Sequence, residues 1–186
     1  RNFGAAGNGV ADDGPALQRA LNALGKSGGG TLYVPPGQYA ITTPVSKDFS
    51  GLASSITIAG ERSRTAIDVA PNGSGLNLTS ELMIHVGPEH VALTLSGLDD
   101  LSIRDVAFVG AQNVDDDAHV VLLVRDIERV GVEHCEFYGL ASLAPGGSIL
   151  AAYGSRLRVD RTAFLGCATN SAHSASIIQN LLWKDI

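Results

Sequence analysis

The sequence is poor in charged residues, in aromatic residues and in cysteine. Charged residues make up 17% of the 186 residues, aromatic residues make up 5%, and the formal net charge is −6. Without a basic cluster, the chain has no electrostatic footprint for nucleic acid. The longest clean apolar run, Val120 to Val124, is too short to span a membrane. The two cysteines, Cys135 and Cys167, form no CxxC pair and no disulfide framework, so we expect two small buried side chains.

Glycine and short apolar segments are abundant instead. The chain has 22 glycines and 45% hydrophobic residues. This balance suits many short strands joined by tight turns better than a bundle of helices. A chain of this length buries one substantial core, so we expect a single all-β domain.

The first 41 residues predict one helix followed by two strands. Residues 12–14 are N-cap candidates, and apolar residues at helical spacing in residues 17–24 predict a short amphipathic helix that ends at Gly25. After the flexible SGGG segment, residues 31–34 alternate as a strand does, and two prolines and a glycine turn the chain into a second strand at residues 39–41. We expect the helix to lie over the open end of the sheet and to hide its first edge.

Three segments of the second half repeat one pattern. LSIRDVAFVG, VGVEHCEFYG and LRVDRTAFLG share aliphatic residues at offsets 0 and 2, phenylalanine at offset 7 and glycine at offset 9; their starts, at residues 101, 130 and 157, differ by 29 and 27. Such a repeat is typical of a parallel β-helix, in which each repeat is one coil. The pattern predicts three ladders: Ile103, Val132 and Val159 inside, Phe108, Phe137 and Phe164 inside, and Gly110, Gly139 and Gly166 at a corner.

The opening FGAAGNGVADD, followed by ALQRAL and GGGTLYVPPGQYAI, resembles the N-terminal signature of the pectate-lyase-like superfamily, which includes polygalacturonases, mannuronan epimerases and phage tailspikes. The resemblance implies an all-β, right-handed parallel β-helix (solenoid) with a short N-terminal capping α-helix. Residues 1–45 would form the cap and first strands, and residues 46–186 the coils of the same domain. A shared fold does not fix a reaction. The Asn-Thr-Asp, Gly-His-Gly and Asp-Pro-His-Glu motifs of these enzymes are absent from the sequence.

Polar residues occupy the outward positions of the repeat. Offset 3 carries Arg104, Glu133 and Asp160, and offset 4 carries Asp105, His134 and Arg161. Opposite or polar partners should therefore meet between neighbouring coils. We interpret these residues as charge ladders that keep the stacked strands in register.

The candidate chemistry lies in the turn NVDDDAHV. Clustered carboxylates bind Ca²⁺, or divide into a protonated acid and an ionised base for glycoside cleavage; a turn of three aspartates can also be simply solvated. The catalytic candidates are Asp115, Asp116, Asp117 and His119. The candidate substrate-binding residues are Arg125, Tyr153 and His173. If the turn holds a cofactor, we expect that cofactor to be Ca²⁺.

Two classes of function remain open. One is a polysaccharide-degrading enzyme, either a glycoside hydrolase or a polysaccharide lyase. The other is a glycan-binding or structural spike or adhesin without catalysis, which would form a homo-oligomer, a trimer in the case of a spike. Both place the protein outside the cell, at a cell surface or on a virion, although the sequence shows no signal peptide. Ile186 would be the first core position of another coil, so we expect this sequence to be the N-terminal part of a longer chain.

Overall fold

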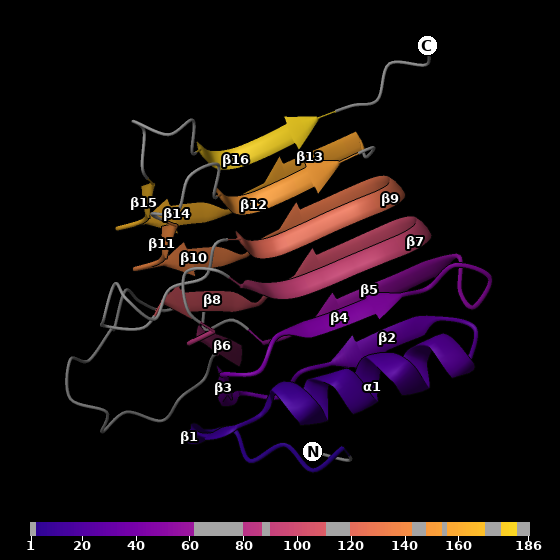
Figure 1. Ribbon diagram of the computed structural model, residues 1–186, viewed down its shortest axis with the longest axis horizontal. Coiled ribbons are helices and arrows are strands. Elements are labelled where there is room, and N and C mark those ends of the chain that lie inside the picture. The colour runs from indigo at the N-terminus through magenta and orange to yellow at the C-terminus, as the bar shows by residue number, and fades with distance from the viewer. Residues whose placement is uncertain are drawn as a thin grey trace.

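The computed structural model describes residues 3–61, 80–86, 90–110, 120–142, 148–153, 156–169 and 176–181. Its elements are β1 (Asn8–Asp12), α1 (Gly14–Lys26), β2 (Gly30–Tyr33), β3 (Gly37–Ile41), β4 (Val45–Asp48), β5 (Ser55–Ala59), β6 (Ser80–Ile84), β7 (Val91–Arg104), β8 (Ala107–Gly110), β9 (Val120–Glu133), β10 (Glu136–Tyr138), β11 (Ala141–Ser142), β12 (Ser148–Tyr153), β13 (Arg156–Asp160), β14 (Ala163–Leu165), β15 (Ala168–Thr169) and β16 (Ser176–Leu181). Figure 1 shows the strands stacked one above another, with α1 across one end of the stack. None of the described helical segments is long and apolar enough to cross a membrane.

The strands form a parallel solenoid with three rows. The first row contains β2, β5, the second half of β7, the second half of β9, and β13. The second row contains β1, β3, β6, β8, β10 and β14, and the third contains β4, the first half of β7, the first half of β9, β12 and β16. Every pairing between described strands is parallel, including the short β11–β15 pair. The predicted β-helix is therefore confirmed.

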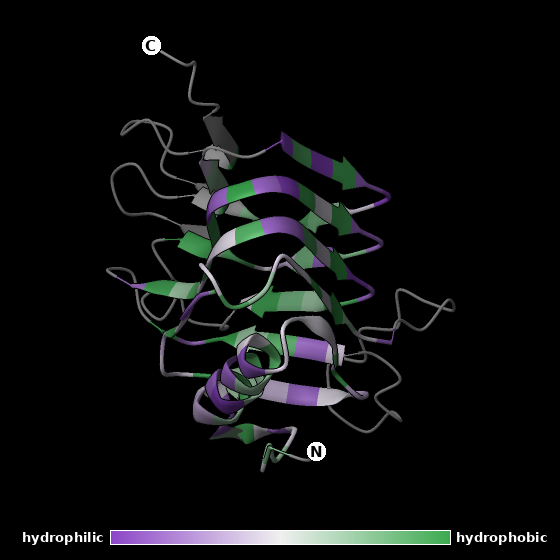
Figure 2. Ribbon diagram, turned by 90° about the vertical axis from the view of Figure 1, so that its right-hand side faces the viewer, coloured by the Kyte–Doolittle hydropathy of each residue, from purple (hydrophilic) through white to green (hydrophobic). Residues whose placement is uncertain are grey.

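The register of the coils follows the sequence repeat. Ile103 pairs with Val132, and Val132 pairs with Val159, so the predicted interior row is confirmed. Ile103 and Val132 are completely buried, and Val159 packs against the same core. Figure 2 shows apolar and polar stretches alternating along the coils, as expected when successive side chains point into and out of the solenoid.

A column of phenylalanines runs through this interior. The rings of Phe108 and Phe137 lie with their centroids 4.7 Å apart and their planes 5° apart; Phe137 and Phe164 stack at 4.7 Å and 7°. The three residues are register partners on β8, β10 and β14. The predicted aromatic ladder is therefore confirmed.

The corner between the first and second rows has left-handed backbone geometry without glycine. Asp105, His134 and Arg161, all at offset 4 of the repeat, have φ values of 59°, 52° and 45°. The backbone N–H of Asp105 donates to the carbonyl of Glu133, 3.2 Å away, and the N–H of His134 donates to the carbonyl of Asp160, 3.0 Å away. Each corner is thus tied to the next coil by a main-chain hydrogen bond.

The glycine ladder is only partly a corner ladder. Gly139 and Gly166 have φ values of 60° and 62°, and they occupy the turns after β10 and β14. Gly110 instead ends strand β8, and a side chain there would collide with the Gly139 carbonyl. The requirement for glycine at position 110 is therefore close packing between coils, whereas at the other two positions it is backbone conformation.

The N-terminal helix caps the solenoid as predicted, but it ends later. It continues through the buried Gly25 to Lys26, and Gly28, with φ of 79°, follows its end. Gly25 is kept small because Lys47 and Leu52 pack beside it, so the prediction that it ends the helix is wrong. The buried Asp13 precedes the helix, and its carboxylate accepts hydrogen bonds from the N–H groups of residues 6 and 7 instead of capping α1.

Candidate functional site

The outward face of the third row carries a polar ladder. Asp48 pairs with Ser96, Ser96 with Arg125, and Arg125 with Tyr153. We call these four residues the outer ladder. The residues immediately before the last three are Leu95, Val124 and Ala152, and all of these are completely buried. Because successive side chains of a strand point to opposite faces, the outer ladder points away from the core.

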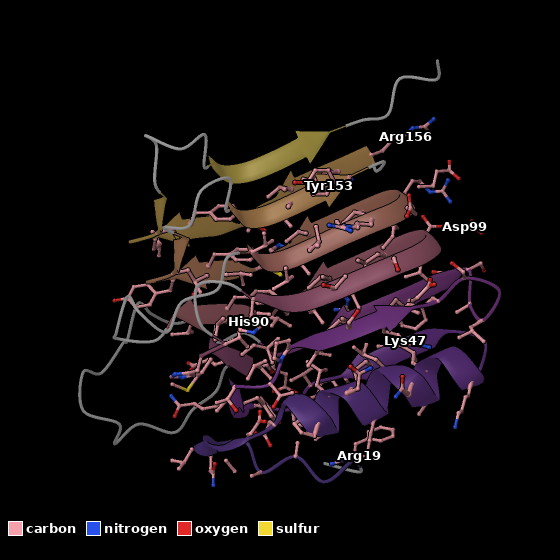
Figure 3. The ribbon with its side chains drawn as sticks, viewed as in Figure 1. Arg19, Lys47, His90, Asp99, Tyr153 and Arg156 are labelled. Atoms are coloured by element: carbon pink, nitrogen blue, oxygen red, sulfur yellow. The ribbon has the colours of Figure 1, made fainter. Side chains whose placement is uncertain are left out.

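Arg125 and Tyr153 contact each other across β9 and β12. The guanidinium carbon of Arg125 lies 5.8 Å from the centre of the Tyr153 ring, which is within cation–π range. Arg125 is exposed. Tyr153, labelled in Figure 3, is partly exposed on β12. Among the described residues, no carboxylate forms an ion pair with Arg125. A cation and an aromatic ring are thus presented together on one face.

The lower end of the ladder is held by a tight bend. The Oδ1 atom of Asp48 accepts hydrogen bonds from the Ser50 N–H, at 3.0 Å, and from the Ser50 hydroxyl, at 2.7 Å. These hydrogen bonds lower the pKa of Asp48 below its usual value. Gly97, with φ of 74°, bends β7 beside them, and a side chain there would collide with Ser50.

β9 bends at the equivalent position. Asp126 follows Arg125 and has φ of 53°, as Gly97 follows Ser96 in β7. The left-handed residue turns the chain from the third row into the first. Arg125 is therefore the last outward-facing residue before this corner. Its strand pairs with β7 on one side and with β12 on the other, and this pairing holds its backbone in place.

The structure brings together two of the predicted site residues. Arg125 and Tyr153 are adjacent, whereas Asp115, Asp116, Asp117, His119 and His173 all lie outside the described residues. The aspartate turn leads into Val120, the first residue of β9. Arg125 lies five residues farther along, about 17 Å at the usual rise of a strand.

The shortest ion pair of the described coils was not predicted from the sequence. Arg129 donates two hydrogen bonds of 2.6 Å to the carboxylate of Asp100, its register partner in the next coil. These bonds lower the pKa of Asp100 and raise that of Arg129. Arg129 also contacts Glu128, at 3.0 Å. The repeat could have predicted this pair. Asp100 and Arg129 are 29 residues apart, the same separation as the aligned repeat positions 101 and 130.

The charged residues at offsets 3 and 4 also form pairs, but mainly within a coil. Arg104 contacts the adjacent Asp105 at 3.1 Å, and Arg161 contacts the adjacent Asp160 at 3.5 Å. One contact joins two coils, between Nε2 of His134 and Nη1 of Arg161 at 3.2 Å. The predicted pairing between coils is therefore present at that contact, and the carboxylates of Asp105 and Asp160 are paired with neighbouring arginines.

No group of three histidine, cysteine, aspartate or glutamate residues within the described ranges is arranged to hold a metal ion. The aspartate turn lies outside those ranges, so Ca²⁺ binding there stays a prediction. Among the described coil carboxylates, those with an arginine partner are Asp100, Asp105, Glu128 and Asp160.

Comparison with known proteins finds one matching family and several relatives. The profile of the rhamnogalacturonase A/epimerase, pectate lyase-like family matches residues 1–96. Mannuronan C5-epimerase AlgE1 of Azotobacter vinelandii is 32% identical over 101 residues, which are 53% of this chain and 7% of that protein. Alginate lyase 7 of the same organism is 48% identical over 42 residues, which are 23% of this chain and 5% of that enzyme.

The fold is also similar to that of a solved structure. The Streptococcus pneumoniae surface protein and adhesin PfbA superposes with a TM-score of 0.58 at 16% sequence identity. The match covers 89% of this chain and 40% of the adhesin. The chain therefore spans a small part of its sequence relatives and less than half of this structural relative.

Proposed function

This chain belongs to the rhamnogalacturonase A/epimerase, pectate lyase-like family, and from that premise we propose that it acts on a polysaccharide as a glycoside hydrolase or a polysaccharide lyase. Its relatives include a mannuronan epimerase and an alginate lyase, whose names identify polymers of uronic acids. We propose the same chemical class of substrate here, a polysaccharide that carries carboxylates. We also propose that the protein works outside the cell.

The contact between Arg125 and Tyr153 is the observation that carries this proposal. A guanidinium group can bind a carboxylate through two parallel hydrogen bonds. The ring of Tyr153 offers an apolar surface beside that cation, and its hydroxyl is a hydrogen-bond donor. Together they supply complementary groups for a sugar with one apolar face and one carboxylate.

The chemical step would belong to the aspartate turn. In hydrolysis, one carboxylic acid among residues 115–117 would protonate the glycosidic oxygen, and a second carboxylate would activate water or attack the sugar. In elimination, one of these carboxylates or His119 would remove the proton on the carbon next to the uronate carboxylate. A carbon–carbon double bond would form as the glycosidic C–O bond breaks, and a protonated acid of the turn would give its proton to the departing oxygen. Arg125, about 17 Å farther along the strand, would bind the carboxylate of another uronate of the same polymer and so position that polymer across the turn.

Calcium would have a limited role in this scheme. The oxygens of Asp115, Asp116 and Asp117 are ligands of the type that Ca²⁺ takes. A bound ion would compete with the proposed acid and base for the same carboxylates. Activity measured with added Ca²⁺ and with a chelator therefore separates the two roles, because chelation should abolish activity only if the ion is required.

The direct test is a panel of purified polysaccharides, with acidic polymers such as alginate and polygalacturonate and neutral polymers as the comparison. Hydrolysis produces new reducing ends, whereas elimination also produces an unsaturated sugar that absorbs ultraviolet light. We expect cleavage of an acidic polymer only. Cleavage restricted to neutral polymers would contradict the assigned substrate class.

Variants then test the site. Arg125→Gln should weaken binding of an acidic polymer at least about tenfold, because a charge-assisted hydrogen bond is worth about 1.5–3 kcal/mol. Arg158→Gln is the matched control, since it removes the same charge from the first row, where Arg158 is 71% exposed. Equal effects of the two substitutions would mean that only net charge matters and would exclude Arg125 as a specific ligand.

A second candidate is glycan binding without catalysis, as in a spike or an adhesin. This function is favoured by the arginine partners of Asp100, Asp105, Glu128 and Asp160, because a carboxylate held by a guanidinium group is a poor proton donor. Binding to the panel without any cleavage, and without loss on Asp115→Asn, Asp116→Asn or Asp117→Asn, would support this function. Sedimentation would show whether a trimer accompanies it.

A further inference from the structure

A cavity of about 320 Å³ lies beneath the capping helix, at the N-terminal end of the solenoid. Its helix side is formed by Ala16, Leu17 and Ala20, and its coil side includes Leu32 of β2 and Leu82 of β6. These side chains are aliphatic, so they would surround a bound molecule with apolar groups. The volume is near the lower end of the range for ligand sites, about 300–1,000 Å³, so it suits a small molecule.

Three aromatic side chains also line this cavity. Phe3 is 39% exposed and Tyr33 is 50% exposed, whereas Tyr39 is buried, so the aromatic lining reaches from the surface into the interior. The hydroxyl of Tyr39 donates to the carbonyl of Pro35, at 3.0 Å. Aromatic rings attract cations that lie over their faces, and this attraction is stronger where water is excluded.

One carboxylate belongs to the same lining. Asp13 is only 3% exposed. Its Oδ1 atom accepts a hydrogen bond from the N–H of Ala6, at 2.7 Å, and its Oδ2 atom accepts one from the N–H of Gly7, at 3.0 Å. A carboxylate has about four acceptor positions, so these two hydrogen bonds leave capacity on both oxygens for a further donor.

This carboxylate has no cationic partner within the part of the chain that the structure describes. None of the ion pairs found there involves Asp13. Arg19 of α1 donates to the carbonyl of Phe3 instead, at 2.9 and 3.2 Å. The start of α1 stabilises the negative charge of Asp13 but does not neutralise it. Since buried charges are ordinarily paired, the cavity offers a carboxylate that a cation can still bind.

We propose that this cavity binds a small organic cation, namely a protonated amine on a compact apolar body. The ammonium group would donate to the carboxylate of Asp13, and the aromatic lining would attract the same charge. The aliphatic side chains of α1 and the first coils would surround the body of the molecule. The site lies beneath α1, separate from the outer ladder, and the inference is independent of the proposed activity.

The probe is phenethylammonium chloride, which carries one ammonium group on a small apolar body. Phenethyl alcohol is the matched neutral control, and phenylacetate is the anionic control. Isothermal titration calorimetry measures binding, and the thermal midpoint should rise with the concentration of a molecule that binds only the folded protein. We expect saturable binding of the ammonium, at least about tenfold tighter than that of the alcohol, because the hydrogen bond to Asp13 is charge-assisted.

Two substitutions separate the charge from the cavity. Asp13→Asn should weaken binding of phenethylammonium by about tenfold or more. Asp12→Asn is the matched control, since it removes the same charge from an exposed neighbour that bonds to Thr43 and is absent from the described cavity lining. Ala20→Leu keeps the carboxylate but fills the space, so it should abolish binding, whereas Ala20→Ser should retain it. Circular dichroism checks that each variant is folded.

Several results would overturn this assignment. One is the absence of saturable binding of phenethylammonium to the native protein, and another is equal affinity for phenethyl alcohol, which would identify a site for apolar groups alone. Equal losses in Asp13→Asn and Asp12→Asn would show that only net charge matters. Undiminished binding to folded Ala20→Leu would place the ammonium outside the cavity, and this result stays decisive even if Asp13→Asn does not fold.

Discussion

The phenylalanine column provides the sharpest test of how the coils are held together. Phe137 is completely buried and stacks on Phe108 below and Phe164 above, whereas among the described residues Phe108 stacks on Phe137 alone. Phe108→Leu and Phe137→Leu both remove one buried ring from similar surroundings. An aromatic pair contributes about 0.5–1.5 kcal/mol beyond the burial of its surface. We therefore expect Phe137→Leu to lower the free energy of unfolding by about 0.5–1.5 kcal/mol more than Phe108→Leu.

Urea unfolding followed by circular dichroism measures both variants, and the double variant completes a mutant cycle. Since one stacked pair is shared, the two costs should sum to more than the cost of the double variant. The slope of the unfolding transition should stay constant, because the surface exposed on unfolding changes little. Equal costs of the two single variants, together with additivity in the double variant, would refute the assignment of a specific stacking contribution.

Three further predictions follow from other parts of the fold. Leu21→Asp should lower the unfolding free energy by several kcal/mol, because it removes a buried leucine and buries a charge under the cap; an unchanged thermal midpoint would contradict the capping role of α1. Arg161→Asn should raise the urea midpoint, since asparagine tolerates φ of 45° better than arginine and the exposed ion pair lost is weak. The pKa of Asp100 is lower in the folded protein than in the unfolded chain, so its ionised carboxylate stabilises the fold at pH values above the pKa of the unfolded chain. This stabilisation is lost as the pH falls through the pKa of the folded protein. Asp100→Asn should therefore make the decline of the urea midpoint below about pH 4 shallower than in the parent protein.

The coils could be predicted because one repeat fixes both the sequence pattern and the hydrogen-bond register. The separation of Leu101 from Val130 is also the separation of their paired strands. Once two coils are aligned, every inward position follows by alternation. This explains why the interior ladders were found from spacing alone.

The corners and ion pairs were less accessible to the same reasoning. Asp105, His134 and Arg161 are three different residue types, and their identities do not predict that they share a left-handed backbone. The turn between two rows imposes that conformation. Gly25 looked like a helix stop, but its small size serves packing against Lys47. Local propensity was overridden by tertiary contact in both cases.

The candidate site was predictable in part. Arg125 and Tyr153 lie 28 positions apart, and a coil of that length places them on neighbouring strands. Their mutual contact depends on side-chain direction at the end of the third row, which the repeat alone does not give. The roles of Asp115 and His119 stay predictions, because chemistry depends on distances between side chains that spacing in sequence does not determine.

The main-chain bonds at the corners have a mechanical consequence. They run from one coil to the next, so they point along the direction in which the coils are stacked, vertical in Figure 1. A load that pulls the two ends apart would open these bonds one coil at a time, as in a zipper, and would not shear many of them together. Each coil released would lengthen the chain by roughly 90–100 Å at 3.3–3.6 Å per residue, so the solenoid would yield to tension in steps while its remaining coils stayed stacked.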